Sequence, residues 1–274
     1  MSIRLVAVDV DGTLVTPDQR ILPRVQAAVS RAARHGIELV LCTGRAAGEC
    51  WYILDALPQI RYAITHTGAM AQDLKTGALL HHCPLSPDDA RQIYRHLRRY
   101  DGLINFFSGG TVYNSTQQMA NFTRYYPAEF YALFTQAHEF VDDLDAMLDG
   151  WDKPVEKFYV PFSGPEEAAR AMADLKQLPY FVTGAGFVDL EVMNPNTNKG
   201  VALQALAEAL GIAREQVMAI GDSGNDAAML DYAGIGVAME NGEDALKRIA
   251  DRIAPSNVVG GVADMLELAI QGAI

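Results

Sequence analysis

Long apolar runs are absent from this sequence. Its longest apolar stretches have the length of a β-strand and are broken by charged side chains, far short of the ~20 residues that cross a bilayer. We therefore expect no membrane span. The first buried strand is predicted within a few residues of Met1, without the basic flank and apolar segment of a secretory signal, so the expected location is the cytoplasm.

Basic residues are scarce relative to acidic ones. Lys and Arg total 22 against 34 Asp and Glu, which gives a formal net charge of -12. This balance argues against a nucleic-acid partner, because such proteins need a basic field to neutralise phosphates. A small anionic substrate would instead need local positive charge or a metal ion at its site.

Cysteine is also rare, with Cys42, Cys50 and Cys83 making an odd number without metal-like spacing. These residues are expected to be reduced, mostly structural thiols rather than a disulfide framework or a zinc site. Half of the residues are hydrophobic and a fifth are charged, as in a globular protein with a substantial core. A chain of 274 residues can form one large or two smaller cores.

Two acids follow the first apolar run. Leu5 to Val8 are all apolar and rich in β-branched side chains, as in a parallel strand buried on both faces, and Asp9 and Asp11 come directly after it. Ligands in open α/β sheets bind beyond the carboxyl ends of the strands. A calcium-binding loop is excluded, because its closing glutamate position is Arg20. A simple turn remains the alternative for this segment taken alone.

Strands and helices alternate in the first and last parts of the chain, which predicts right-handed crossovers and a parallel sheet. Predicted helices are 22–35, 46–57, 199–210, 225–232, 243–250 and 259–270, and predicted strands are 5–8, 37–42, 61–65, 217–220 and 235–238.

The middle of the chain has a different pattern, in which hairpins occur beside helices. Helices are predicted at 86–100 and 166–178, a strand at 155–162, and hairpins at 103–107 with 111–114 and 180–183 with 187–192, whereas 117–149 has no clear periodicity. We therefore predict an α/β fold: a Rossmann-like parallel-sheet core of residues 1–82 and 192–274, interrupted by an inserted α+β cap domain of residues 83–191.

Four segments place polar residues at predicted strand ends, and these residues together suit phosphate chemistry. These segments carry Asp9 with Asp11, Thr43, Lys199, and the run from Gly221 to Asp226. A carboxylate can attack phosphorus directly and form an aspartyl-phosphate, a role for which Asp9 is placed. The leaving alkoxide needs a proton and the water of the second step must lose one, and Asp11 suits both duties.

Attack by a carboxylate on a phosphate dianion is opposed by like charge, so this site requires cations. Mg²⁺ prefers oxygen ligands and usually takes one or two carboxylates, which Asp9 and Asp222 would supply. The backbone carbonyl of Asp11 could add a third ligand, and Asp226 is expected to orient a bound water. Lys199 supplies the remaining positive charge.

The phosphoryl oxygens also need neutral hydrogen-bond donors. We assign this role to backbone N–H groups around Gly12 and Thr13, and to Thr43 with Gly44 and Asn225. Thr43-Gly44 alone is more often a helix start than a ligand, and Lys199-Gly200 alone is more often a solvated helix start. The run from Gly221 to Asp226 is harder to explain as a mere connection, and the four segments together favour a site.

These segments resemble those of a known superfamily. Asp9-Val10-Asp11-Gly12-Thr13-Leu14, Thr43-Gly44-Arg45, Lys199-Gly200 and Gly221-Asp222-Ser223-Gly224-Asn225-Asp226, in this order, are similar to the motifs of the haloacid dehalogenase superfamily of Mg²⁺-dependent phosphatases. The branch resembled is the Cof-type sugar-phosphate phosphatases, in which a large α/β cap lies between the second and third motifs. The resemblance implies that Asp9 is the nucleophile, and the second acid, Asp11, favours phosphate chemistry over dehalogenation.

Two positions depart from the pattern of that branch. Thr67 stands where an Asn is frequent, which puts a substrate contact from that position in doubt, and Asn198 stands where Ser is common before the lysine. Neither change touches the expected chemical step.

The expected function is a Mg²⁺-dependent phosphatase that acts through an aspartyl-phosphate on a small phosphorylated metabolite. The resemblance places sugar phosphates first, with phosphorylated cofactors or their precursors, such as pyridoxal phosphate or flavin mononucleotide, close behind. A phosphomutase or phosphotransferase using the same intermediate is one alternative, and a non-catalytic phosphometabolite-binding regulator is another. Oligomeric state is left open.

Overall fold

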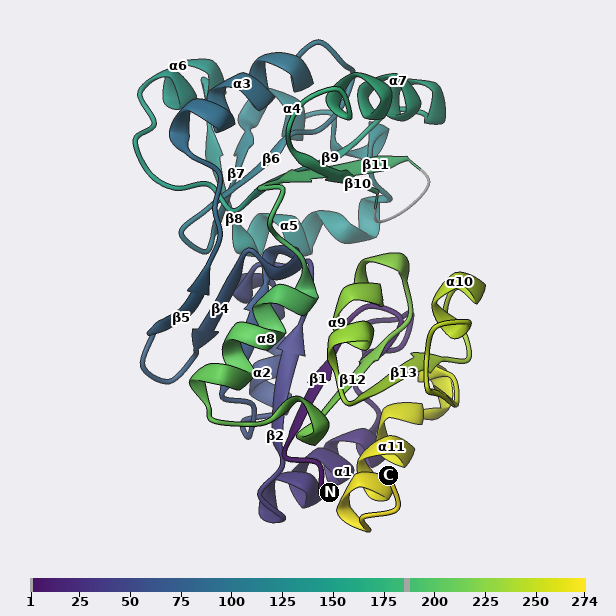
Figure 1. Ribbon diagram of the computed structural model, residues 1–274. Helices are drawn as coiled ribbons and strands as arrows, with labels where there is room; N and C mark the ends of the chain where they lie inside the picture. Colours follow the sequence, from purple (N-terminus) through teal and green to yellow (C-terminus); the bar gives the residue numbers. More distant parts are fainter. Residues whose placement is uncertain (1, 185–187) are drawn as a thin grey trace. The chain divides into compact units, whose positions relative to one another are not determined.

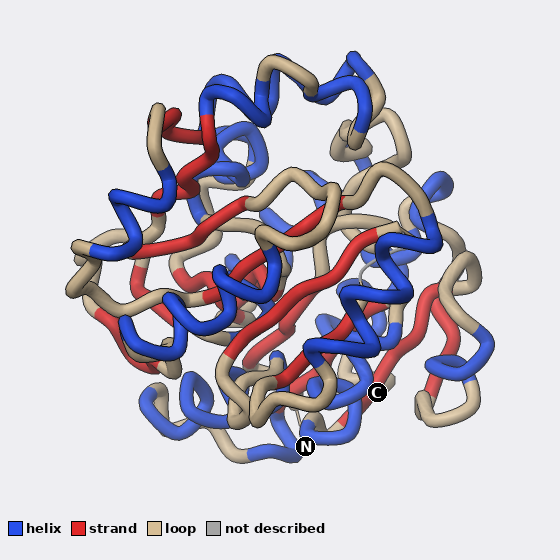
Figure 2. The backbone as a smooth tube through the Cα atoms, turned by 90° about the horizontal axis from the view of Figure 1, so that it is seen from above, coloured by secondary structure: helices blue, strands red, loops and turns tan. Residues whose placement is uncertain are grey.

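The structure, a computed structural model, describes residues 2–184 and 188–274 and divides the chain into two compact units. The first unit consists of Met1–His82 and Asn198–Ile274, and the second of Cys83–Thr197. Figure 1 labels the elements of both units, and Figure 2 shows by colour how strands and helices follow one another along the backbone.

The first unit contains an eight-stranded sheet in the order β14-β13-β12-β1-β2-β3-β4-β5. From β14 to β3 neighbouring strands are parallel, and β4 and β5 join the edge as antiparallel strands. The strands are β1 (Leu5–Val8), β2 (Glu38–Cys42), β3 (Tyr62–Thr65), β4 (Met70–Asp73), β5 (Leu79–His82), β12 (Val217–Gly221), β13 (Ile235–Met239) and β14 (Arg252–Ala254).

Helices cover both faces of this sheet, because successive residues of its buried strands point to opposite sides. Val6 and Val8 of β1 belong to a core cluster that also takes residues from α1, α2 and α11, whereas Leu5 and Ala7 pack in a cluster with α8 and α9. The helices of this unit are α1 (Pro23–Arg34), α2 (Trp51–Ala56), α8 (Lys199–Ala209), α9 (Ala227–Tyr232), α10 (Asp244–Lys247) and α11 (Gly261–Ile270).

The second unit has its own six-stranded sheet in the order β10-β11-β9-β6-β7-β8. Its pairings are antiparallel except that of β7 with β8. The strands are β6 (Asn105–Ser108), β7 (Thr111–Ser115), β8 (His138–Val141), β9 (Lys157–Pro161), β10 (Phe181–Thr183) and β11 (Asp189–Met193).

Helices of the second unit build a separate core against this sheet. Phe106, Phe158 and Val192 pack with residues of α3, α6 and α7, and a smaller cluster around Phe122 and Phe134 involves α4 and α5. The helices are α3 (Pro87–Leu97), α4 (Thr116–Met119), α5 (Tyr131–Ala137), α6 (Leu144–Asp149) and α7 (Pro165–Leu175).

The predicted fold class, a Rossmann-like core with an inserted α+β segment, is confirmed by this architecture. The strands β4, β5 and β14 were not predicted, because each is short and lies at or next to an edge of the sheet, without a long apolar run. Residues 117–149, left unassigned from the sequence, contain α4, α5, β8 and α6.

Two details of the predicted organisation are corrected. The second boundary lies between Thr197 and Asn198 rather than between residues 191 and 192, because β11 pairs with β9 and β10 inside the second unit. Lys199 begins helix α8, as predicted, but the strand before this helix, β11, belongs to the sheet of the second unit and not to the core sheet. The turn expected at 184–186 lies largely outside the described residues.

Two expectations from composition can be compared with the structure. Cys42, Cys50 and Cys83 are free thiols, the first two of them buried. Among the residues that the structure describes, no helix is long and apolar enough to cross a membrane.

Candidate active site

Three of the predicted site residues follow neighbouring strands. Asp9 comes after β1, Thr43 after β2 and Asp222 after β12, and β1 lies between the other two in a parallel register. Because the carboxyl ends of adjacent parallel strands meet at one edge of the sheet, residues more than 200 positions apart are brought together. The Thr13 hydroxyl, for example, donates to Oδ1 of Asp222 at 3.2 Å across a separation of 209 residues.

Lys199 reaches this edge from the start of α8. The side chain of Asn198 caps the helix by accepting a hydrogen bond from the N–H of Val201 at 2.9 Å, which fixes where the helix begins. The Lys199 side chain is fully buried, and its Nζ donates to Oδ1 of Asp9 at 2.7 Å and to Oδ1 of Asp226 at 2.6 Å. The first residue of α8 therefore places a buried ammonium group between two carboxylates.

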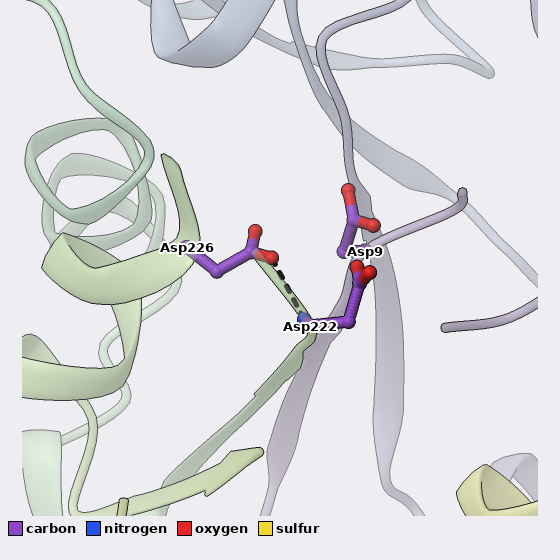
Figure 3. A group of neighbouring side chains, drawn as sticks. All are labelled: Asp9, Asp222 and Asp226. Carbon is purple, nitrogen blue, oxygen red and sulfur yellow. Dashed lines mark hydrogen bonds between the residues drawn. The ribbon is translucent and has the colours of Figure 1, made fainter. Parts of the chain in front are cut away.

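The three carboxylates of Asp9, Asp222 and Asp226 form one group, with an oxygen from each lying within 4.8 Å of the others (Figure 3). Asp226 is held in place by the backbone as well as by Lys199. Its Oδ2 accepts the N–H of Asp222 at 2.9 Å and that of Ser223 at 3.1 Å. Asp226 therefore fixes the loop that presents Asp222.

Burial governs the electrostatics of this group. Desolvation raises the pKa of Asp9 well above its usual range, and the charges of Asp226 and Asp222 add to this effect while Lys199 opposes it. Desolvation and the charge of Asp226 raise the pKa of Asp222 to about 6. Burial works against the charge of Lys199, but the carboxylates of Asp226 and Asp9 outweigh it and raise the pKa of the ammonium group.

Glycine is required where the loops approach the carboxylates. Gly12 has a φ of +78°, and a Cβ atom there would lie 2.2 Å from Oδ2 of Asp222. A Cβ at Gly221 would lie 2.4 Å from the carboxyl carbon of Asp226. Both positions therefore permit a backbone approach that any other residue would block.

The donor set fits a hard divalent cation. Three carboxylates face a single ammonium group, so the group has a formal excess of two negative charges when all are ionised. Such an excess in a buried place is costly unless a cation compensates it, and carboxylate oxygens are the ligands that Mg²⁺ prefers. Asp9 and Asp222 are the available ligands, because both oxygens of Asp226 already accept hydrogen bonds.

Other predicted site residues make local contacts. The Thr43 hydroxyl oxygen accepts the N–H of Arg45 at 3.1 Å, directly beside Gly44, and Oδ1 of Asn225 accepts the hydroxyl of Ser223 at 3.0 Å. The Asp11 carboxylate is not part of the three-carboxylate group and pairs with Arg45 instead.

Comparison with known proteins decides the family. Residues 6–266 match the model of the haloacid dehalogenase-like hydrolases. The chain belongs to this hydrolase family. The predicted resemblance is therefore confirmed.

Individual relatives agree with this family over nearly the whole chain. The protein YxeH of Bacillus subtilis is 31% identical over 266 residues, covering 95% of this chain and 96% of its own. The pyridoxal phosphate phosphatase YbhA of Escherichia coli is 28% identical and covers 97% of this chain and 98% of its own. The solved structure of a haloacid dehalogenase-like hydrolase from B. subtilis has a TM-score of 0.85 at 25% identity, covering 97% and 99% of the two chains.

Thr67, which stands where Asn is frequent in the Cof-type branch, lies in a turn with an unusual backbone conformation. His66, Thr67 and Gly68 have φ values of +52°, +57° and +101°, and a Cβ at Gly68 would lie 2.3 Å from the backbone of Asn198. Asn tolerates this left-handed conformation better than the β-branched Thr67 does. The turn therefore packs through Gly68 against the backbone at the start of α8.

Sequence reasoning missed several polar residues of this hydrolase. Arg45 was part of a motif without an assigned role, and Gln19, Tyr52 and Asn241 were not considered. The side-chain amide of Asn241 donates to the carbonyl of Gly12 at 2.8 Å, while the other three residues form a network around Asp11. No local pattern marks these residues, because their partners are distant in the sequence.

Proposed function

We propose that this chain is a Mg²⁺-dependent phosphomonoester hydrolase that acts on small phosphorylated metabolites through an aspartyl-phosphate on Asp9. One observation carries the proposal: Asp9 is buried, paired with Lys199 at 2.7 Å, and grouped with two further carboxylates at the carboxyl edge of a parallel sheet. In this setting the ammonium group of Lys199 can hold the carboxylate of Asp9 in place and partly neutralise its charge.

In the first step, a carboxylate oxygen of Asp9 attacks the phosphorus atom and the ester P–O bond breaks. The electron pair of that bond leaves with the alkoxide, which takes a proton from the carboxyl group of Asp11 and departs as an alcohol. The ammonium group of Lys199 remains beside Asp9 throughout and offsets the negative charge that gathers around the transferred group.

In the second step, a water molecule attacks the same phosphorus atom and gives a proton to the carboxylate of Asp11. The bond between phosphorus and Asp9 breaks, so inorganic phosphate leaves and both aspartates return to their initial state. Backbone N–H groups at Gly12 and Thr13, with Thr43, Gly44 and Asn225, are proposed to bind the phosphoryl oxygens.

Asp9, Asp222 and the backbone carbonyl of Asp11 are the proposed ligands for Mg²⁺, with Asp226 acting through a bound water. When bound, Mg²⁺ supplies positive charge that lets a carboxylate approach a phosphate dianion. The contribution of the chain is to hold Asp9 and Asp222 at the required separation, which the contacts of Asp226 with the 221–226 loop support.

Sugar phosphates are the proposed substrate class, and specificity is assigned to the inserted residues 83–197. The relative YbhA is named for pyridoxal phosphate, so phosphorylated cofactors belong in the same screen. A panel of sugar phosphates, pyridoxal phosphate and flavin mononucleotide, scored by released inorganic phosphate, ranks these classes. An isomeric phosphate ester without free phosphate would instead indicate a phosphomutase.

The proposal is tested by replacing Asp9 with Asn. Asp9→Asn keeps the size of the side chain but removes the nucleophilic carboxylate, so we expect Mg²⁺-dependent phosphatase activity to fall by at least about 1,000-fold. Mass spectrometry of acid-quenched wild-type enzyme should detect phosphate on the peptide that contains Asp9.

Asp88→Asn is the matched control, because the Asp88 side chain is 93% exposed on a helix of the second unit. It should retain wild-type turnover. Near-normal turnover by a folded Asp9→Asn protein would remove the nucleophile assignment.

A further inference from the structure

Arg45 binds the carboxylate of Asp11 through two hydrogen bonds. Its Nε donates to Oδ2 at 2.8 Å and its Nη2 donates to Oδ1 at 2.5 Å, so both carboxylate oxygens are engaged at once. Two parallel hydrogen bonds from a planar guanidinium fix the orientation of a carboxylate as well as its position. The side chain of Asp11 is 52% exposed, whereas that of Arg45 is only 14% exposed.

Arg45 is itself held by two further side chains. Its Nη2 donates to Oε1 of Gln19 at 2.6 Å, and its Nη1 donates to the hydroxyl of Tyr52 at 3.1 Å. The Tyr52 hydroxyl in turn donates to the same Oε1 of Gln19 at 2.7 Å, which closes the network. The guanidinium group is therefore mostly buried and held by Gln19 and Tyr52 as well as by Asp11, and the side-chain amide of Gln19 also donates to Oδ1 of Asp11 at 3.3 Å.

The loop that carries Gln19 is shaped for this contact. Gln19 has a φ of +61°, a conformation that non-glycine residues adopt rarely. Hydrogen bonds within the loop keep it there, since the N–H of Gln19 donates to the carbonyl of Thr16 at 2.8 Å and the N–H of Thr16 to the carbonyl of Arg20 at 2.9 Å. Strained backbone of this kind persists where surrounding contacts determine it, often beside functional groups.

The carboxylate of Asp11 lies outside the three-carboxylate group of Asp9, Asp222 and Asp226 and is bound by Arg45 instead. Attacking and leaving oxygens lie roughly in line in phosphoryl transfer, so the group that protonates the leaving oxygen must lie beyond the phosphorus atom rather than beside Asp9. A partly exposed carboxyl group, fixed outside the carboxylate group, meets this requirement. A mobile Asp11 would have no such fixed position.

We propose that Arg45 is a positioning residue for Asp11, supported by Gln19 and Tyr52. This inference rests on the proposed phosphatase function, in which Asp11 transfers the proton. Arg45 acts through Asp11, and its contribution is the orientation of that carboxyl group.

The test compares two phenyl esters in Arg45→Ala. We expect kcat to fall by about 100-fold, the order seen when a catalytic group is misplaced or lost, with KM changed by no more than about threefold. The first turnover should slow much more for phenyl phosphate than for p-nitrophenyl phosphate, because p-nitrophenolate leaves readily without a proton. Tyr52→Phe, which removes one anchor of Arg45, should show the same pattern with a smaller loss.

Chemical rescue separates positioning from a structural role. Guanidinium ion added at millimolar concentration should restore part of the turnover of Arg45→Ala, whereas urea, which is planar but neutral, should not. Arg61→Ala is the matched control, since Arg61 pairs with Asp73 in the same unit, at 2.6 Å, and its loss should leave both esters unaffected. Thermal unfolding of each variant establishes that it is folded.

Equal slowing of the first turnover for the two esters in folded Arg45→Ala, or no rescue by guanidinium, would overturn the positioning role while leaving the phosphatase proposal intact. A wild-type enzyme that hydrolyses neither ester nor any member of the metabolite panel would overturn both.

Discussion

At the scale of single residues, the main feature of the site is that its charged groups are buried away from water. Asp226 and Lys199 are completely buried, and Asp9 nearly so. Ions in such surroundings are tolerated only when they are paired and hydrogen-bonded. Lys199 contacts two carboxylates but offsets only one of the three negative charges, which leaves an excess of two, including the charge of Asp222, to be balanced by a bound divalent cation.

This imbalance predicts that protons and Mg²⁺ compete for the carboxylate of Asp222, each stabilising the folded protein when bound. Its pKa is raised from the usual 3.8 to about 6, mainly by desolvation, so the folded state binds this proton more tightly than the unfolded state. The resulting stabilisation of the metal-free protein is full below pH 4 and is lost as the pH rises through about 6. Mg²⁺ should therefore stabilise the protein at pH 8, by about 3 kcal/mol at 100 times its Kd, and far less at pH 5.

Thermal unfolding with EDTA or Mg²⁺ at the two pH values measures this effect, with NaCl at matched ionic strength as the control. Asp222→Asn should abolish the Mg²⁺-induced shift in Tm. An equal shift at both pH values, or one that persists in Asp222→Asn, would contradict the ligand role of Asp222.

At the scale of elements, the position of α8 decides where Lys199 lies. The helix packs against α9 through Gly200, where a Cβ atom would lie 2.3 Å from the carbonyl oxygen of Ala228. Close packing of α8 against α9 therefore explains why a glycine, Gly200, follows Lys199. This glycine lets two helices approach closely at the residue that follows Lys199.

Gly200→Ala should push these helices apart and displace Lys199. Overpacking of this kind costs about 1–3 kcal/mol, so we expect a lower Tm together with reduced phosphatase activity. Gly48→Ala is a matched control, because a Cβ there meets no atom within 4 Å, and it should be neutral or slightly stabilising. Wild-type Tm and activity in Gly200→Ala would refute the close-packing explanation.

At the scale of the whole molecule, the second unit has the features of an independent insertion. It has its own sheet and its own apolar core. Its ends meet, since the hydroxyl of Thr197 donates to the carbonyl of Cys83 at 3.0 Å. Domains with neighbouring ends can be inserted into, or excised from, a host fold with little strain.

A fragment of residues 83–197 should therefore fold by itself, with a cooperative thermal transition and dispersed amide signals in its NMR spectrum. The shorter fragment 83–191 follows the boundary predicted from the sequence. It lacks the last two residues of β11, the strand that pairs with both β9 and β10, and should be much less stable. A disordered 83–197 fragment, or equal stability of the two, would contradict the boundary at Thr197.

Much of the fold could be read from local patterns. The strand before Asp9 and the helix with Val25 and Val29 on its buried face are recognisable because apolar residues recur at the period of each element. Short edge strands such as β14 lack this signal and were missed. The aromatic-rich residues 117–149 pack in a small cluster of their own, so no single period describes them.

The sequence by itself determined the chemistry available at the edge of the sheet: two acids after β1, the acidic loop after β12, and a lysine before a glycine. These are properties of short segments, set by composition and spacing. Only the tertiary structure decided that Lys199 bridges Asp9 and Asp226, across separations of 190 and 27 residues, and that Arg45 takes Asp11 out of the carboxylate group. Such pairings depend on how strands and helices pack, because the fold decides which partner lies within hydrogen-bond distance of each charged group and how far each is removed from water.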